Sequence, residues 1–228
     1  LNEIFDTQTT LIEKESQEQH PKASENRVVF EKVTFTYAGA GAPALEDISF
    51  VAKSGETIGI IGGTGSGKTT LIHLIPRFYD IQKGEILVDK IPVDRYPFWQ
   101  LREKVGMVPQ HAVLFKGTVR ENMRWGKSDA TDEEIWEALK IAQAKEFVEN
   151  RPGGLDSQIS QGGANLSGGQ RQRLTIARAL VGQPEILIMD DSASALDFAT
   201  DAALRQAIKE KTKGMTVFLV SQRAASIR

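Results

Sequence analysis

The feature that most limits what this chain can fold into is the octapeptide GGTGSGKT at residues 62–69. It follows an apolar segment, residues 57–61, which looks like a buried strand, and it runs into a helix predicted over residues 68–74 that Pro76 would end. Glycines let successive backbone N–H groups turn toward a polyphosphate, because no Cβ stands in the way. A strand, a glycine-rich loop and a helix in this order predict a phosphate-binding loop.

The residue types in this loop suit a triphosphate with Mg²⁺. Lys68 adds a positive charge for the outer phosphates, and the Thr69 hydroxyl can bind the metal ion. The alternative is a surface lysine after a glycine-rich turn, which the flanking strand and helix disfavour. The residues predicted to bind the nucleotide here are Gly62, Gly63, Thr64, Gly65, Ser66, Gly67, Lys68, Thr69 and Thr70.

A second glycine-rich motif, LSGGQ, occupies residues 166–170. It is too polar for a core, yet it runs directly into a helix predicted over residues 171–180. A Ser-Gly-Gly helix start offers N–H groups and the positive end of the helix dipole to an anion. A plain loop before a helix is the alternative. The chain therefore has two candidate phosphate-binding helix N-termini.

With these two loops and further motifs, residues 27–228 resemble the ATP-binding domain of an ABC transporter. VPQ at residues 108–110 resembles the family's Q-loop, and EILIMDD at residues 185–191 resembles its Walker B segment. SALD at residues 194–197 is similar to the D-loop, and TVFLVSQR at residues 216–223 lies where the family has its switch strand and loop. The shared order of the motifs is a far more specific signal than the phosphate-binding loop alone.

The resemblance implies an α/β fold: a P-loop NTPase with a RecA-like parallel sheet core, an antiparallel β subdomain and a helical lobe inserted at about residues 111–170. Apolar residues alternate from Val33 to Tyr37, which predicts a strand, and they follow helical spacing over residues 132–144. Further predicted elements are strands at residues 47–52, 186–189 and 217–220 and a helix at residues 201–211. Alternating strands and helices favour a largely parallel sheet.

By the same resemblance, Gln110 would reach the Mg²⁺ bound by Thr69 and couple the helical lobe to the nucleotide state; its alternative is an ordinary polar loop residue. Asp190 ends an apolar strand, where an uncompensated carboxylate is costly, and binding Mg²⁺ through water would remove that cost. Tyr37 lies where the family has an aromatic residue that stacks on adenine, but it could also belong to the core.

The resemblance also implies that LSGGQ serves a second ATPase domain. In the family, two such domains hold two ATP molecules head to tail, and the signature of one domain closes on the nucleotide bound by the other. Gln161 stands where many exporters have glutamate in a loop thought to signal to the membrane domain. The residues assigned to the partner's nucleotide are Ser167, Gly168, Gly169, Gln170 and Asp197.

Two residues depart from the family pattern. The general base is usually glutamate, but here it is Asp191, whose carboxylate is retracted by about 1.5 Å, one C–C bond. A misplacement of about 1 Å at a reacting group costs on the order of 10²-fold in rate. The switch residue is usually histidine, but here it is Gln222, which cannot become cationic. With Gln110, these are the candidate catalytic residues.

Together the two departures predict a site that binds Mg-ATP well and hydrolyses it slowly, while the intact LSGGQ completes a competent site on a partner with Glu and His. On this interpretation, the chain is the half of a heterodimeric exporter whose own ATP site is degenerate. A homodimer with two slow sites, an importer ATPase subunit, a non-transport family member and a regulatory nucleotide sensor are the alternatives. RFYD at residues 77–80 and FKGTVREN at residues 115–122 are typical of exporters and argue against the importer.

The composition limits the kinds of partner and ligand that this chain is expected to bind. The net charge of -2 gives no reason to expect nucleic acid, and there is no cysteine for disulfide or thiolate chemistry. His20, His73 and His111 lack the spacing of transition-metal ligands. No apolar run approaches the roughly 20 residues that cross a bilayer. A transmembrane domain is therefore expected outside these residues.

The two ends of the sequence lead to further expectations. The polar residues 1–26 resemble the linker that joins the membrane domain of an exporter to its ATPase domain, and a plain polar tail is the alternative. The linker interpretation would place residues 27–228 at the cytoplasmic face of the cell membrane. Family members continue with more strands and a helix beyond the switch segment, so a truncated C-terminus is also expected.

Overall fold

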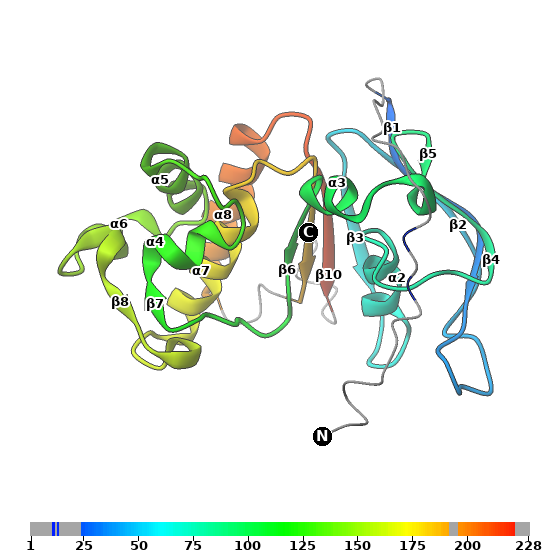
Figure 1. Cartoon of the computed structure of the whole chain (residues 1–228), viewed down its shortest axis with the longest axis horizontal. Coiled ribbons are helices and arrows are strands. Elements are labelled where there is room, and N and C mark those ends of the chain that lie inside the picture. The colour runs from blue at the N-terminus through cyan, green and yellow to red at the C-terminus, as the bar shows by residue number, and fades with distance from the viewer. Residues whose placement is uncertain (1–10, 12, 14–23, 192–195, 222–228) are drawn as a thin grey trace. The chain divides into compact units, whose positions relative to one another are not determined.

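The computed structural model describes residues 11, 13, 24–191 and 196–221, which form two compact units (Figure 1). The first unit takes its described residues from Leu1–Lys53 and Thr69–Arg102, and the second from Ser54–Lys68 and Glu103–Arg228. The first contains an antiparallel sheet, and the second contains a parallel sheet and most of the helices. In the part of the chain that is described, no helix combines the length and apolar character needed to span a bilayer.

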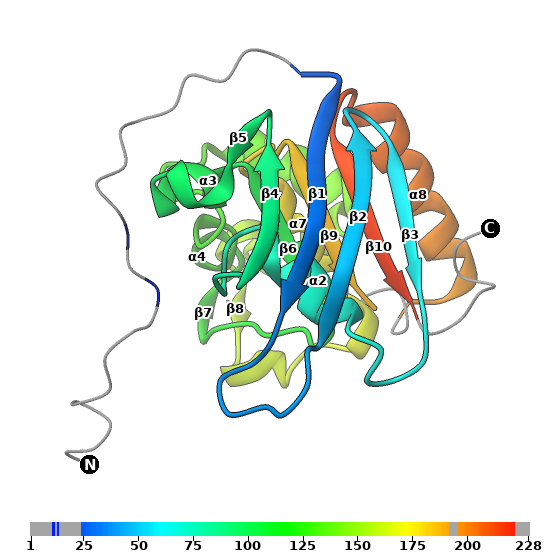
Figure 2. The same cartoon turned by 90° about the vertical axis from the view of Figure 1, so that its right-hand side faces the viewer.

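The sheet of the first unit has the strand order β2-β1-β4-β5, and Figure 2 shows β2, β1 and β4 side by side. Phe30 of β1 is opposite Phe50 of β2, and their rings stack at 4.6 Å between centroids. The alternation predicted from Val33 to Tyr37 is confirmed for Val33 and Phe35, which are buried, but β1 ends at Phe35 and Tyr37 lies beyond it. The elements of this unit are β1 (Asn26–Phe35), β2 (Leu45–Lys53), most of α2 (Lys68–Leu74), β4 (Lys83–Val88), β5 (Ile91–Pro92), η1 (Val93–Arg95) and most of α3 (Phe98–Glu103).

An irregular pairing between β1 and β4 explains why residue 84 is a glycine. Gly84 has φ +82°, and a Cβ on it would lie 2.3 Å from the carbonyl oxygen of Glu31. Lys32 beside it also has a positive φ of 48°, and the register of β1 shifts at this point. The bulge requires glycine on β4 because β1 approaches too closely for any side chain.

The parallel sheet of the second unit has the order β3-β10-β9-β6. β3 has the predicted bounds, but the expectation that it is buried is wrong: Ile61 is 52% exposed, because β3 is an edge strand that pairs only with β10 among the described strands. Every residue of β9, in contrast, is buried between β10 and β6. The strands are β3 (Thr57–Ile61), β6 (Val105–Val108), β9 (Ile186–Asp190) and β10 (Thr216–Ser221).

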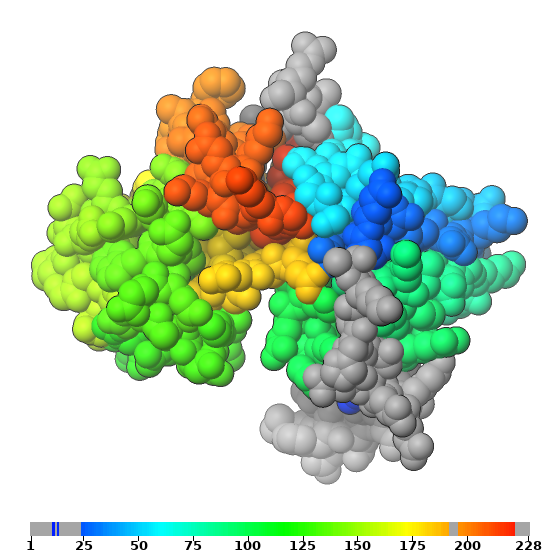
Figure 3. All heavy atoms as spheres, turned by 90° about the horizontal axis from the view of Figure 1, so that it is seen from above, coloured from blue at the N-terminus to red at the C-terminus, as the bar shows by residue number. Residues whose placement is uncertain are grey.

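A helical lobe in the same unit packs on α7, and Figure 3 shows its green to yellow-green residues as one continuous surface. The helix predicted over residues 132–144 begins as predicted, with Thr131 as the N-cap in a capping box with Glu134. It ends earlier, at Ile141, because Gln143 turns the chain with φ 57°. The lobe comprises β7 (Gly117–Thr118), α4 (Val119–Arg124), α5 (Asp132–Ile141), α6 (Lys145–Glu149), η2 (Gly154–Asp156), β8 (Gln158–Ile159) and η3 (Gln161–Gly163).

Two helices of the second unit begin earlier than predicted, because polar caps extend them. α7 (Gly168–Leu180) begins directly after Ser167, and α8 (Phe198–Lys211) begins directly after Asp197. Each of these two side chains accepts a backbone hydrogen bond from the first turn that follows it. Both glycines of LSGGQ are therefore part of a helix rather than of a loop before it.

Candidate functional site

Lys68 lies over the loop that precedes it. Its Nζ donates hydrogen bonds of 2.7 Å to the carbonyl oxygens of Gly62 and Gly63. Gly65 and Gly67 have φ values of +78° and +84°, which residues with a Cβ rarely adopt. The loop therefore needs glycine at these two positions, and its turns leave the lysine charge beside exposed backbone. This is the arrangement of groups that binds an anion.

The parallel sheet brings several predicted site residues to one edge. Ile61, Asp190 and Val108 are near or at the carboxyl ends of strands whose registers align. The phosphate-binding loop at residues 62–67 follows the first of these strand ends, and Gln110 follows the last. In open parallel α/β sheets, ligands bind at the carboxyl edge, so these residues share the edge where a nucleotide would bind.

Asp190 and Asp191 differ in their surroundings. Asp190 is 5% exposed and forms the end of β9, whereas Asp191 is half-buried and has left the strand with φ 44°. The N–H of Asp191 still donates to the carbonyl oxygen of Val220 at 3.0 Å. The main chain at the position of the expected general base is therefore held by β10 in a conformation that is uncommon for a non-glycine residue.

Tyr37, Thr69 and Thr70 belong to the first unit. Tyr37 lies beyond the end of β1, and its hydroxyl is 2.9 Å from the Thr70 Oγ1 in α2. Its ring meets those of Phe35 and Tyr79 edge-on, at 4.8 Å and 5.3 Å between centroids. Tyr37 is 37% exposed, so the alternative that it is a core residue is wrong. Its stacking on adenine remains a prediction.

The oxygen donors predicted for Mg²⁺ have suitable chemistry. Thr69 offers a hydroxyl, Gln110 an amide oxygen and Asp190 a carboxylate, and these hard oxygen ligands are the type that Mg²⁺ prefers. Among the described residues, no group of three or more His, Cys, Asp or Glu side chains could hold a metal by itself. In nucleotide sites Mg²⁺ usually also binds phosphate oxygens and water.

The start of α7 is closed by a capping box. Ser167 Oγ accepts a 3.2 Å hydrogen bond from the Gln170 N–H, and Gln170 Oε1 accepts one of 3.0 Å from the Ser167 N–H. Gln170, predicted to bind the partner's nucleotide, thus also holds the helix start. Beyond its chain neighbours and its own helix backbone, no described atom lies within 4 Å of where a Cβ on Gly168 would be. The open space suits the close approach of an external group.

Asp197 caps α8. Its carboxylate accepts hydrogen bonds from the backbone N–H of Thr200 at 2.9 Å and from the Thr200 hydroxyl at 2.7 Å. These bonds hold the pKa of Asp197 below its usual range. Gln222 and residues 192–195 lie outside the described residues. Gln161, in η3, is exposed.

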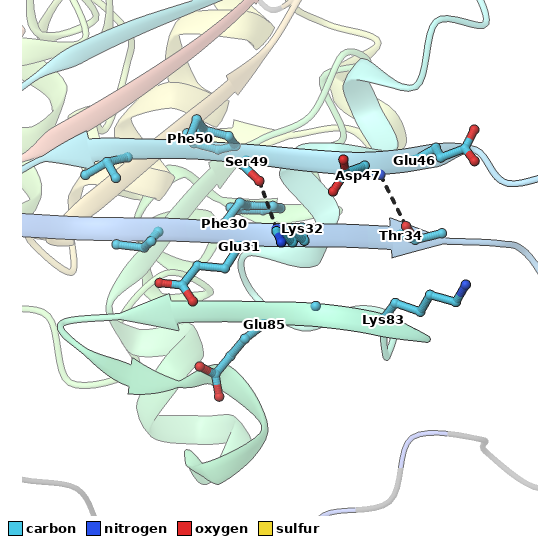
Figure 4. A pocket seen from close by; sticks show the side chains of 13 residues that line it. Phe30, Glu31, Lys32, Thr34, Glu46, Asp47, Ser49, Phe50, Lys83 and Glu85 are labelled. Atoms are coloured by element: carbon cyan, nitrogen blue, oxygen red, sulfur yellow. Dashed lines mark hydrogen bonds between the residues drawn. The ribbon is translucent and has the colours of Figure 1, made fainter.

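A hollow of about 1100 Å³ in the first unit lies elsewhere, on the face formed by β1, β2 and β4 (Figure 4). Two bulge hydrogen bonds cross it, from the Lys32 N–H to Ser49 Oγ at 2.9 Å and from the Asp47 N–H to Thr34 Oγ1 at 3.2 Å. Acidic and basic side chains are interspersed around it. None of the residues predicted to bind ATP lines this hollow.

Sequence reasoning did not single out Arg173. It is one of two arginines in QRQR after the signature, and nothing in the sequence distinguishes them. In the structure, Arg173 Nη1 donates to the carbonyl oxygen of Gln143 at 2.7 Å, and its guanidinium lies 4.9 Å from the centroid of the Phe147 ring. These contacts join residues far apart in the sequence, which no local pattern reveals.

Comparison with known proteins adds independent evidence. A family model described as "ABC transporter" matches residues 45–194. The chain is 47% identical over 197 residues to the "Uncharacterized ABC transporter ATP-binding protein YfiB" of Bacillus subtilis, covering 86% of this chain and 34% of that protein. It is 44% identical over 200 residues to the "Probable multidrug resistance ABC transporter ATP-binding/permease protein YheI" of the same species, covering 88% and 34%.

A solved structure titled "Structure of a bacterial Atm1-family ABC exporter with ATP bound" aligns with a TM-score of 0.86 and 34% identity, covering 96% of this chain and 38% of that one. The chain spans about a third of the length of the curated relatives that it matches.

Proposed function

Since the chain belongs to the ABC transporter family, as an ATP-binding domain with the P-loop NTPase fold, we propose that it binds Mg-ATP and pairs head to tail with a second such domain to drive export across a membrane. The observation that carries this proposal is the carboxyl edge of the parallel sheet, which the phosphate-binding loop, Asp190 and Gln110 share. The exporter assignment is supported by the names of relatives and of the aligned structure.

Each residue at this edge has a distinct task in the proposal. Backbone N–H groups of residues 62–67 and the Lys68 ammonium hold the phosphates. Thr69, Gln110 and Asp190 hold the magnesium ion, which neutralises phosphate charge when bound. Asp191 orients the attacking water as general base, and Tyr37 stacks on the adenine.

The signature and Asp197 act on the nucleotide of the partner. This part of the proposal is supported by the exposure of Ser167 and by the open space at Gly168, where a Cβ would meet no described atom within 4 Å beyond its chain neighbours and its own helix backbone. Gly169, Gln170 and Asp197 are the other residues of this chain that act on the partner's nucleotide.

The other proposed partner is a transmembrane domain. Residues 1–26 form the linker from it to residues 27–228, which lie at the cytoplasmic face of the membrane. Within the first unit, the linker residue Glu13 accepts a 2.8 Å hydrogen bond from the N–H of Phe98, at the start of α3.

We also propose that the chain is the degenerate half of a heterodimer. Asp191 carries a carboxylate that is one methylene shorter than that of glutamate, on a main chain fixed by β10. Gln222 lacks the charge of a histidine imidazolium. Both residues slow the chain's own site, while its signature serves a partner that has Glu and His at these positions.

The test is Mg-ATP affinity and steady-state turnover of the purified chain beside the Asp191→Glu/Gln222→His variant. We expect both to bind Mg-ATP and the variant to turn over on the order of 10²-fold faster, because its base regains the missing reach. Lys68→Ala in both backgrounds is the control and should abolish binding. Rapid turnover by the unaltered chain would contradict the degenerate site and favour a self-sufficient homodimer.

A further inference from the structure

Arg171 reaches back from α7 to the turn that precedes LSGGQ. Its Nη1 donates hydrogen bonds of 3.4 Å to the carbonyl oxygens of Gly163 and Leu166. Its backbone N–H donates to the carbonyl oxygen of Ser167 at 3.0 Å. The chain enters the helix through Leu166 and Ser167, so Arg171 bonds to the main chain of both residues at this entry.

Gly163 has the geometry that this contact requires. A Cβ on Gly163 would lie 2.8 Å from Cδ and 2.9 Å from Cγ of Arg171, and the φ of this glycine is +71°. The aliphatic part of the arginine therefore occupies the space of a side chain at residue 163. The Leu166 N–H closes the same turn with a 3.0 Å hydrogen bond to the Gly163 carbonyl oxygen, and the Leu166 side chain is buried. The packing and the hydrogen bonds of Arg171 thus act on one short, closed turn.

The position of Arg171 in the helix indicates what the contact does. In many helices an apolar residue before the N-cap packs against the fourth helical residue, which fixes the angle at which the chain enters. In α7 these two positions are Leu166 and Arg171, since Ser167 is the N-cap. In α5, whose N-cap is Thr131, the fourth residue is the buried Ile135. The arginine of α7 fastens the entry of the chain through carbonyl groups instead.

We propose that Arg171 is a positioning residue for the signature, which fixes the direction in which Ser167 and Gly168 enter α7. The glycine pair after the N-cap makes such a contact necessary, because glycine leaves the main chain more conformations than other residues do. A helix start that is already held in one direction offers its N–H groups to an anion without a further cost of ordering. This consequence for the partner's nucleotide rests on the proposed function.

The test is site-resolved hydrogen exchange on the full chain. Arg171→Met keeps an aliphatic stem beside Gly163 but has no donor for the two carbonyl groups. We expect the Gln170 N–H, which is bonded to Ser167 Oγ, to exchange about fivefold faster, because losing a typical hydrogen bond raises the population of the open state by about that factor. Arg171→Lys, whose side chain is shorter but still donates, should restore part of the protection.

The matched control is Arg124→Met in the same helical lobe. Nε and Nη2 of Arg124 both donate to the carbonyl oxygen of Ala130 at 3.4 Å. Ala130 immediately precedes Thr131, the N-cap of α5. Arg124 thus bonds to the carbonyl group before an N-cap, as Arg171 does, but at the entry of a different helix.

Each variant has its own reporter, because both helices begin with a capping box. The Glu134 N–H is bonded to Thr131 Oγ1 at 3.3 Å. Arg171→Met should accelerate the Gln170 amide and leave the Glu134 amide unchanged, and Arg124→Met should leave the Gln170 amide unchanged. An unchanged Gln170 amide in Arg171→Met, or equal acceleration of that amide by both variants, would overturn the inference.

Turnover separates positioning of the signature from a loss of stability alone. In the Asp191→Glu/Gln222→His background, Arg171→Met should lower kcat about tenfold, because small displacements near a reacting group are costly. The Kd for Mg-ATP should stay within about twofold, because Arg171 is not part of the phosphate-binding loop. Arg124→Met should change neither quantity, and a kcat that Arg171→Met leaves unchanged, or that both variants lower equally, would contradict the inference. The exchange experiment needs neither nucleotide nor partner, so a failure to bind Mg-ATP would overturn the proposed function and be recognised separately.

Discussion

At the scale of single residues, the glycines of this chain divide into those that its own fold requires and those that it does not. Gly84 is required, since a Cβ would meet the Glu31 carbonyl oxygen at 2.3 Å and φ is +82°. Gly168 is different, because it is the first residue of a helix, and a Cβ on it would meet no described atom within 4 Å beyond its chain neighbours and its own helix backbone. The described part of the fold therefore does not require glycine at this position.

This difference gives the first prediction. Gly168→Ala should raise the free energy of unfolding by about 0.5–1 kcal/mol, because alanine loses less backbone entropy in a helix than glycine. Gly84→Ala should lower it by more than 1 kcal/mol, because the backbone must move. Urea denaturation of both variants measures the two changes. A loss of stability in Gly168→Ala would show that the fold itself needs this glycine.

At the scale of elements, caps decide where the two helices nearest the signature and the D-loop begin. Ser167 and Asp197 each accept a hydrogen bond from the third residue after them, which extends both helices three residues beyond the apolar pattern that predicted them. The cap of α8 carries a charge near the positive end of the helix dipole, and the cap of α7 does not.

The charged cap predicts a pH dependence. The Thr200 hydrogen bonds lower the pKa of Asp197 in the folded chain. The stability that the Asp197 carboxylate contributes is therefore fully present above its pKa in the unfolded chain. That stability is lost as the pH falls through its pKa in the folded chain. Asp197→Ala should therefore lower the thermal midpoint at pH 7, and its difference from the unaltered chain should shrink in acid. Asp197→Asn should retain most of the midpoint at pH 7. Melting curves at pH 7 and in acid test this, and a pH-independent difference would contradict it.

Elements with a strong local signal could be predicted from sequence, and those set by pairing could not. β3 and α2 were predicted with their observed bounds, since the loop motif between them marks both. The two-residue strands β5, β7 and β8 are defined only by their partners. The exposed position of β3 could not be predicted either, because strand order is a property of the sheet and not of an apolar run. For the same reason the contacts of Arg173 could not be predicted, whereas the loop, Asp190 and Gln110 were predicted as site residues from their motifs.

At the scale of the whole molecule, the chain's own ATP site departs from the family pattern at Asp191 and Gln222, whereas its signature, LSGGQ, matches that pattern. If both acted on the same nucleotide, an intact signature would serve a slow site. In the proposed head-to-tail pair the two would be separated, because each signature would act on the nucleotide held by the other domain's phosphate-binding loop. The absence of cysteine in the sequence also means that labels and cross-links can be placed at chosen positions without background.

The last prediction is a complementation experiment that separates signature from cradle. The first chain is an Asp191→Glu/Gln222→His variant that also carries Gly168→Asp. Its own ATP site is restored, but the new carboxylate in its signature repels phosphate. Alone, this triple variant should therefore turn over ATP slowly. Adding the unaltered chain supplies an intact signature in trans, and turnover should rise at least tenfold and saturate as mixed pairs form. A chain with only Gly168→Asp is the matched control, and adding it should give no rise in turnover.

Two outcomes would contradict this prediction. If the triple variant is fully active by itself, the ATP site of one domain does not need the signature of the other. If both additions stimulate turnover equally, the effect does not come from LSGGQ. A rise with the unaltered chain alone is the result that head-to-tail pairing requires, since only then does the signature of one chain act on the phosphates held by another.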